Sequence, residues 1–436
     1  MIEATSVEAS TMKKLTRRIV PFVLLLYIIA VMDRVNIGFA ALTMNADLGI
    51  SPSTFGMLAG IFFVAYFFFE VPSNILMHKF GARRWIARIL ISWGLVTVAI
   101  AAAQNATHIG ILRVLLGMAE AGFYPCIILY LTFFFPSRYF ARTLSLFMIG
   151  QGLANIVVGP ISTLILDHVS WLGLASWRWL FILQGIPAVL LGFVTLSVMV
   201  DRPEQAKFLT AEEKQWLIST LKAEYEAKMA KSKDKISSKW SVFKVGRVWH
   251  LGLIYFCYVT ALYGLGLWMP QVLRAMSEMM SNTQIGLLST IPYICAVIVM
   301  NLVGRHSDKT GERRKHVGIP ISFAFFSLIA LTYSNNIWLS LVLLAFSTSA
   351  IYCFIGTFWT LPTAFLGEAT AAVGIALINS VGNLGGFAGP YLVGFMKDLT
   401  GSTNGGMYFL ASTALLCCIL VLALPKELEK VEVARA

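Results

Sequence analysis

The sequence predicts an all-α integral membrane protein with twelve transmembrane helices, arranged as two pseudo-symmetric halves of six. Three observations predict this fold class. The chain is 58% hydrophobic and only 13% charged, whereas soluble domains average about 25% charged residues. Apolar runs that reach the roughly 20 residues of a spanning helix recur along the chain. One loop pattern occurs twice, and its central glycines, Gly81 and Gly311, are 230 positions apart.

The apolar runs predict the individual spans in chain order. A bilayer leaves backbone groups without water, so each run is expected to form a helix that satisfies its own hydrogen bonds. The ten-residue alternation that is typical of barrel strands is not visible. The predicted spans are 19–42, 54–77, 85–104, 109–133, 142–166, 178–200, 249–272, 284–304, 317–334, 337–361, 372–396 and 406–425.

The distribution of Lys and Arg predicts the orientation. If both termini are cytoplasmic, only Arg178, Arg274 and Lys397 lie in loops on the opposite side. Such a bias is the usual positive-inside signal. The net charge of +12 therefore needs no nucleic-acid partner. We expect a multi-pass protein of a bacterial inner membrane, present as a monomer.

One long polar segment divides the spans six and six, and predicts the domain organisation. Within it, Thr210 and Glu213 have the spacing of a capping box, so short amphipathic helices are expected, followed by a flexible Lys/Ser-rich stretch at 228–239. The predicted parts are a cytoplasmic tail at 1–18, a first half at 19–200, a cytoplasmic linker at 201–247, a second half at 248–425 and a tail at 426–436.

Four charged residues lie within the predicted spans of the first half, away from their ends: Asp33, Arg34, Arg113 and Glu120. Charges in a bilayer are costly and by default indicate a substrate or proton site. At 1.5 Å per residue, Asp33 lies about 21 Å along its span, at about the level of Arg113. Helical side chains lean toward the N-terminus of their own helix, which brings Arg34 and Glu120 toward each other. We therefore expect the pairs Asp33–Arg113 and Arg34–Glu120. A static packing network is the alternative.

These residue types suggest how an anion and a proton could be coupled. Arginine can hold a carboxylate through two hydrogen bonds, so Arg34 and Arg113 are candidate substrate-binding residues. A buried acid can carry a proton, so Asp33 and Glu120 are candidate proton-coupling residues. Glu70 is expected to pair with a basic loop residue, and His78, His250, His306 and His316 are expected to be solvated.

The repeated loop reads Gly304-Arg-His-Ser-Asp-Lys-Thr-Gly-Glu-Arg-Arg314 in the second half and Asn74-Ile-Leu-Met-His-Lys-Phe-Gly-Ala-Arg-Arg84 in the first. It resembles the signature loop of the major facilitator superfamily, although Asn74 and His78 depart from the pattern. A plain solvated basic loop is the alternative. The resemblance implies a gating role for Gly81, Arg83, Arg84, Gly304, Asp308, Gly311, Arg313 and Arg314.

Further stretches narrow the resemblance. They are Asp33-Arg-Val-Asn-Ile-Gly38, Phe69-Glu-Val-Pro-Ser-Asn74, Arg113-Val-Leu-Leu-Gly-Met-Ala-Glu-Ala-Gly122 and Asp201-Arg-Pro-Glu-Gln-Ala206. They resemble the anion:cation symporter family, and NIGFAALTM, GARRWIAR and KDLTG resemble its bacterial tartrate transporters and hydroxyphenylacetate permeases. This likeness implies proton-coupled import of a small carboxylate, and it adds Tyr66, Gln151, Trp359, Asn379 and Asn383 to the substrate-binding candidates.

Other classes of function remain as alternatives. Sodium could replace the proton within the same family, or the chain could be an integral-membrane enzyme or a sensor that only binds acids. The sequence shows no Walker loop, so an ion gradient rather than ATP is expected to supply energy. No catalytic or metal-binding cluster and no cofactor motif is visible, and the six cysteines form no Cys-x-x-Cys pair. The expected partners are therefore a small organic anion, protons and the lipid bilayer.

Overall fold

The computed structural model describes residues 6–232, 243–276, 279–363 and 368–425. All of the elements formed by the first half are helices. They are α1 (Ser6–Asp47), α2 (Pro52–Phe80), α3 (Ala82–Ile100), α4 (Ala106–Glu120), α5 (Phe123–Thr132), α6 (Ser137–His168), the 3₁₀ turn η1 (Trp171–Gly173) and α7 (Ser176–Val198).

The linker and the second half continue the helical pattern. The linker forms the short turn η2 (Pro203–Gln205) and α8 (Ala211–Ser232). The second half consists of α9 (Gly246–Met276), α10 (Asn282–Thr310), α11 (Arg314–Thr332), α12 (Ile337–Phe358), α13 (Thr360–Thr363), α14 (Glu368–Asn383), α15 (Gly385–Thr400) and α16 (Thr403–Leu422).

Ten helices in the described ranges are long and apolar enough to cross a membrane. That tally treats α4 and α5 as one span, and two further predicted spans fall short for identifiable reasons. α3 is not among the ten because its first two turns carry three arginines, Arg83, Arg84 and Arg88. The predicted span 372–396 is divided at Leu384 into α14 and α15, each of 16 residues. Together these elements account for the twelve predicted spans.

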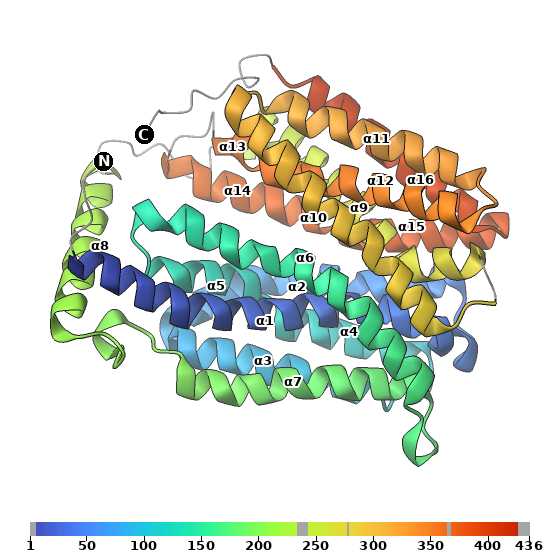
Figure 1. Cartoon of the computed structure of the whole chain (residues 1–436), viewed down its shortest axis with the longest axis horizontal. Coiled ribbons are helices and arrows are strands. Elements are labelled where there is room, and N and C mark those ends of the chain that lie inside the picture. Colours follow the sequence, from blue (N-terminus) through green and yellow to red (C-terminus); the bar gives the residue numbers. More distant parts are fainter. Residues whose placement is uncertain (1–5, 233–242, 277–278, 364–367, 426–436) are drawn as a thin grey trace.

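The two halves lie side by side as two helix bundles, coloured blue to green and yellow to red in Figure 1. We call the end where α1 begins the tail end and the opposite end, where α2 and α10 begin, the far end. Between the halves, α2 packs on α15, α6 packs on α10, and α1 packs on α9. The α2–α15 and α6–α10 pairs are equivalent positions of the repeat, so the interface has the pseudo-symmetry expected of a duplicated bundle.

Residues 6–18 of the predicted tail extend α1 as one continuous helix. Lys14 Nζ on this extension contacts Glu213 on α8 at 2.8 Å, and Ser10 donates to the same carboxylate at 2.7 Å. The predicted capping box of Thr210 and Glu213 also forms. Burial raises the pKa of Glu213, but hydrogen bonds from Lys14, the Thr210 backbone and Ser10 outweigh it and hold that pKa at about 2.

In its described part, the linker therefore contains one long α-helix docked on α1, rather than several short ones. The first part of the stretch predicted to be flexible, residues 228–232, is the last turn of α8. The remainder, 233–239, lies outside the described residues. Docking of α8 on α1 attaches the linker to the first half, at the left in Figure 1.

Candidate functional site

Arg34 is the centre of the intramembrane charge cluster. It lies about two-thirds of the way along α1, and its side chain is 16% exposed, whereas that of Glu120 is fully buried. The two form an ion pair through Arg34 Nη2 and Glu120 Oε1, as the sequence predicts. The guanidinium also lies over the rings of Phe62, at 5.4 Å, and Tyr66, at 5.3 Å, in cation–π geometry. Aromatic faces and a carboxylate thus hold this cation in an otherwise apolar region.

Arg34 also reaches across the interface between the halves. Its Nη1 donates to the hydroxyl of Tyr263, on α9 of the second half, at 3.3 Å. The Tyr263 ring packs against Phe63 on α2, with ring centroids 4.3 Å apart. The guanidinium is therefore in contact with both halves, and any rocking of one half against the other changes its surroundings.

The predicted pair Asp33–Arg113 does not form. Asp33 accepts hydrogen bonds from Asn36 at 3.0 Å and from Thr97 on α3 at 2.5 Å. Arg113 donates instead to the backbone carbonyls of Leu58, at 3.2 Å, and Ala59, at 3.0 Å. Successive residues of a helix point about 100° apart, so Asp33 faces α3 while Arg34 faces α4 and α9. Equal depth in the membrane was therefore insufficient to pair Asp33 with Arg113.

Three polar atoms in this cluster have unused hydrogen-bonding capacity. Arg34 Nε, Arg113 Nη1 and Glu120 Oε2 are buried, and no group among the described residues hydrogen-bonds to them. Leaving such atoms unpaired is costly, at roughly 1–3 kcal/mol each or more for charged groups. Two cationic donors and one anionic acceptor are thus available to a ligand that carries its own carboxylate or proton.

The predicted span 109–133 is interrupted directly after Glu120. Ala121 leaves the helical conformation, and Gly122 adopts φ +85°, which separates α4 from α5. A Cβ at Gly122 would lie 2.5 Å from the Ser73 hydroxyl oxygen on α2, so the close approach also requires glycine. Interrupted helices with their ends at the site are common in transporters. The sequence had predicted one continuous span at 109–133.

The neighbours implied by the resemblance lie on both halves. Tyr66 is buried against Arg34. Gln151 on α6 accepts a 3.4 Å hydrogen bond from Tyr27, which is two turns before Arg34 on α1. In the second half, Trp359 packs on Tyr255 with centroids 4.9 Å apart.

Asn379 and Asn383 are both partly buried on α14, one turn apart. Within the described ranges, no hydrogen bond, ion pair or ring contact joins Gln151, Trp359, Asn379 or Asn383 directly to Arg34. The structure thus brings Tyr66 to the charge cluster and leaves these four on the surrounding helices.

Glu70 differs from its predicted role. It is 8% exposed, and its carboxylate accepts from Asn379 Nδ2 on α14 at 3.4 Å rather than pairing with a loop cation. Because α2 and α14 belong to different halves, this is a second polar contact across the interface. Glu70 is one helical turn after Tyr66, which places a third acid near the cluster.

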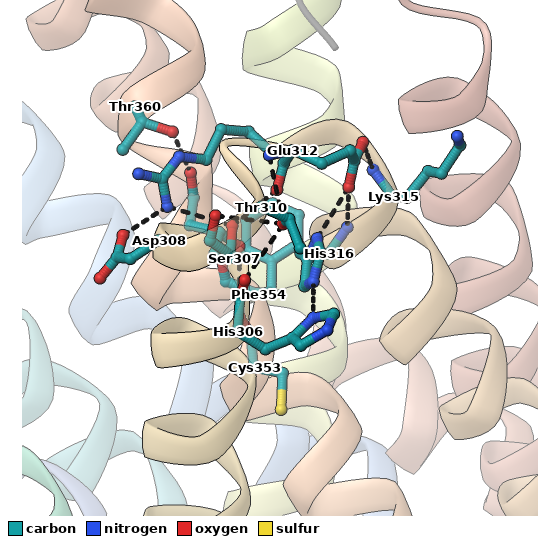
Figure 2. Close-up of polar contacts among 12 residues, drawn as sticks. His306, Ser307, Asp308, Thr310, Glu312, Lys315, His316, Cys353, Phe354 and Thr360 are labelled. Atoms are coloured by element: carbon teal, nitrogen blue, oxygen red, sulfur yellow. Dashed lines mark hydrogen bonds and ion pairs between the residues drawn. The ribbon is translucent and has the colours of Figure 1, made fainter. Parts of the chain in front are cut away.

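The loop between α10 and α11 is drawn in Figure 2, where Asp308, Glu312 and His316 lie around the turn. Gly311 takes φ +67° and ends α10. Arg313 pairs with Asp308 at 2.6 Å, and Arg314 donates to the Leu424 carbonyl, after the end of α16, at 2.6 Å. Gly304 has open space around it. These contacts fix the turn and tie it to α16.

Three of the four histidines that the sequence predicted to be solvated have defined partners, although His306, like His78, is exposed as predicted. His306 Nδ1 and His316 Nε2 are 2.6 Å apart, and His316 Nδ1 lies 2.7 Å from the Glu312 carboxylate (Figure 2). His250 Nε2 lies 2.9 Å from the Leu420 carbonyl. Histidine therefore contributes to the packing of the second-half loop and of α9 on α16.

The first-half loop binds a carboxylate from outside its own motif. His78 occupies the position of the motif aspartate, and Asp201, after α7, accepts from the Arg83 backbone N–H at 2.8 Å. Gly81 has φ +85°, and a Cβ there would lie 2.8 Å from Asp201 Oδ1. The side chains of Arg83 and Arg84 are exposed. Asp201 thus caps α3, as Glu312 does for α11 by accepting from the Lys315 backbone N–H at 2.6 Å.

Several residues of the cluster could not be predicted from the sequence. Phe62 contacts both arginines, at 5.4 Å from Arg34 and 5.0 Å from Arg113, yet it is one of 30 phenylalanines. Tyr263 and Thr97 become neighbours of the site only through tertiary packing. Asn36 was detectable, because an i, i+3 spacing places it beside Asp33 on one helix face.

Comparisons with known proteins are consistent with this geometry. The chain matches the family described as Major Facilitator Superfamily over residues 23–390 and 275–435. It is 46% identical to a protein of Agrobacterium vitis named "Putative tartrate transporter", over 97% of this chain and 96% of that protein. It is 38% identical to a "Quinolone resistance transporter" of Acinetobacter baumannii, over 97% and 96%.

The fold also matches solved structures. The inward open conformation of the xylose transporter XylE from E. coli superposes with a TM-score of 0.76, at 13% identity, over 95% of this chain and 97% of that chain. At this identity the likeness concerns the fold alone.

Proposed function

This chain belongs to the major facilitator superfamily, and we propose that it imports a small organic anion together with protons by alternating access. It is a multi-pass membrane transporter and not an enzyme. The observation that carries the proposal is the buried ion pair of Arg34 and Glu120, held in contact with Tyr263 of the opposite half. The substrate class is a carboxylate, with tartrate-like hydroxy acids as the first candidates because of the relatives' names.

The cluster supports a simple coupling scheme. A substrate carboxylate that binds Arg34 with two hydrogen bonds competes with Glu120 for the same cation. Glu120 would then be a buried charge without its partner, which is strongly unfavourable unless it takes up a proton. Asp33, held by Thr97 and Asn36 without an ion pair, is the second candidate proton carrier. Substrate and proton are therefore expected to bind together.

The proposed domain organisation follows the helices. Two transport halves at 19–200 and 248–425 are joined by the linker at 201–247, with the tail end of the bundle in the bacterial cytoplasm. The far end, where the halves meet, would then face the periplasm. The tail at 426–436 lies outside the described residues.

Uptake into proteoliposomes tests the function. Purified protein is screened by thermal shift against hydroxy, dicarboxylic and aromatic acids, and the best ligand is then supplied as a radiolabel. A pH gradient, acidic outside, should drive uphill accumulation that a protonophore abolishes. Accumulation driven by a sodium gradient alone, or binding without accumulation, would contradict proton-coupled import. Export would be detected by loading the same vesicles from within.

The orientation gives a separate prediction. An alkaline phosphatase or fluorescent-protein reporter fused after Ala436, or inserted within 233–239, should report the cytoplasm, because nearly all loop Lys and Arg lie on that side. A reporter inserted beside Leu172, which is 87% exposed at the far end, should report the periplasm. A periplasmic signal from either of the first two positions would contradict the twelve-span topology.

A further inference from the structure

Two aspartates at the far end bridge the halves in equivalent ways, and neither belongs to the charge cluster. We propose that Asp167 and Asp398 are positioning residues of the transport cycle: together they hold the far end closed, and their release accompanies its opening. They lie at the ends of α6 and α15, the two helices that cross to the opposite half.

Asp167, near the end of α6, binds the first turn of α10. Its carboxylate accepts from the Thr283 backbone N–H at 2.6 Å, from the Thr283 hydroxyl at 2.7 Å and from Asn282 Nδ2 at 2.7 Å. Arg274 Nη2 donates to Oδ1 of the Asn282 side-chain amide. That contact fixes the orientation of the amide, so that its NH₂ group faces Asp167.

Asp398, near the end of α15, binds the first turn of α2 in the same manner. Its carboxylate accepts from the Ser53 backbone N–H at 2.8 Å. Ser53 and Thr283 each occupy the second position of their helices, after the N-caps Ser51 and Ser281. Unpaired N–H groups and the helix dipole favour an anion at this position. Each aspartate thus caps a helix of the half to which it does not belong.

The two contacts are copies of each other under the repeat. Ser51 and Ser281, like Ser53 and Thr283, are 230 positions apart, which is also the separation of Gly81 and Gly311. Asp167 and Asp398 are 231 positions apart. Because both the donors and the acceptors follow the repeat, the same contact between the halves occurs twice in the molecule.

The helices beneath each aspartate are in backbone contact. A Cβ at Gly56 would lie 2.2 Å from the Pro390 carbonyl, and one at Gly286 would lie 2.7 Å from the Gly159 carbonyl. Gly56 and Gly286 are again 230 positions apart. A seam this close leaves no path between the halves at these crossings, so opening the far end must separate the same helices that the aspartates hold.

The strength of the contacts suits a reversible closure. Both aspartates are exposed, so water can replace their helix partners when the ends separate. Hydrogen bonds of this kind contribute modestly to an equilibrium, about threefold to tenfold per contact set. Two such contact sets favour the closed state of the far end over the open state but still allow it to open.

Hydrogen–deuterium exchange of the full-length protein in nanodiscs, without substrate, measures both ends at once. Asp167→Asn and Asp398→Asn should each shift the open-to-closed ratio of the far end about threefold to tenfold. Exchange should rise in the far-end peptides covering 52–60 and 282–290. In alternating access the tail end closes when the far end opens, so exchange should fall in the tail-end peptides covering 68–80 and 373–383. The double variant should show about the product of the single effects, since the sites are independent.

Asp47→Asn is the matched control. Asp47 also lies at the far end, but it accepts from Trp177 of its own half at 2.8 Å. Asp47→Asn should therefore leave exchange in the tail-end peptides, 68–80 and 373–383, unchanged. Thr283→Val, which removes only the hydroxyl donor, should shift exchange in the same direction as Asp167→Asn but less. Exchange that rises only at 52–60 and 282–290, with no protection gained at the other end, would show that the aspartates are simple helix caps. Because no substrate is used, this result is independent of the proposed function.

Discussion

Arg34→Ala should abolish detectable binding of the organic acid and all uptake. The guanidinium is the one group of the cluster that contacts Glu120, two aromatic rings and the opposite half. Its loss removes a charge-assisted carboxylate contact and also leaves Glu120 as an unpaired buried charge, which costs about 3–5 kcal/mol. Isothermal titration with the ligand identified by thermal shift measures the change.

Two further variants separate charge from geometry. Arg34→Lys keeps the charge but loses the planar fork, so binding should weaken by roughly tenfold or more rather than disappear. Tyr263→Phe removes only the hydroxyl across the interface and should weaken binding by about threefold to tenfold. Wild-type affinity in both Arg34 variants would show that Arg34 is a packing charge, and the carboxylate site would then have to be sought at Arg113.

Asp33→Asn and Glu120→Gln should each collapse proton-driven uphill uptake in proteoliposomes. A permanently neutral amide cannot take up and release the proton that coupling requires. Substrate binding and substrate–substrate exchange should survive, because neither amide removes Arg34. In Glu120→Gln the affinity should even rise or lose its pH dependence, since the anion no longer competes with a carboxylate for the guanidinium.

Asp47→Asn is the control for this pair, because Asp47 lies on the same helix as Asp33 but contacts Trp177 outside the cluster. It should retain full uphill uptake. Glu70→Gln tests whether the third acid, which contacts Asn379, shares the proton. Full accumulation with unchanged pH dependence in both Asp33→Asn and Glu120→Gln would reject these residues as proton carriers and leave the four charges as a structural network.

The membrane fold and the identity of the charged residues were accessible from the sequence for one physical reason. Spanning a bilayer requires long apolar runs, and any charge within them is costly enough to be conspicuous. Asp33, Arg34, Arg113 and Glu120 are visible in the sequence on that basis alone, as is the loop repeated at Gly81 and Gly311. The pair Arg34–Glu120 followed from depth and from the lean of helical side chains.

Tertiary structure decided everything that depends on the direction of a side chain around its helix and on how the halves meet. The direction of the Asp33 side chain around α1 places it beside Thr97 rather than Arg113. The close approach of Gly122 to Ser73 accompanies the end of α4 after Glu120. Asp201 caps α3 through the Arg83 backbone N–H, although the two residues are 118 positions apart in the chain. Asp167 and Asp398 acquire their partners only because α6 packs on α10 and α15 packs on α2, and no local pattern specifies which surfaces will meet.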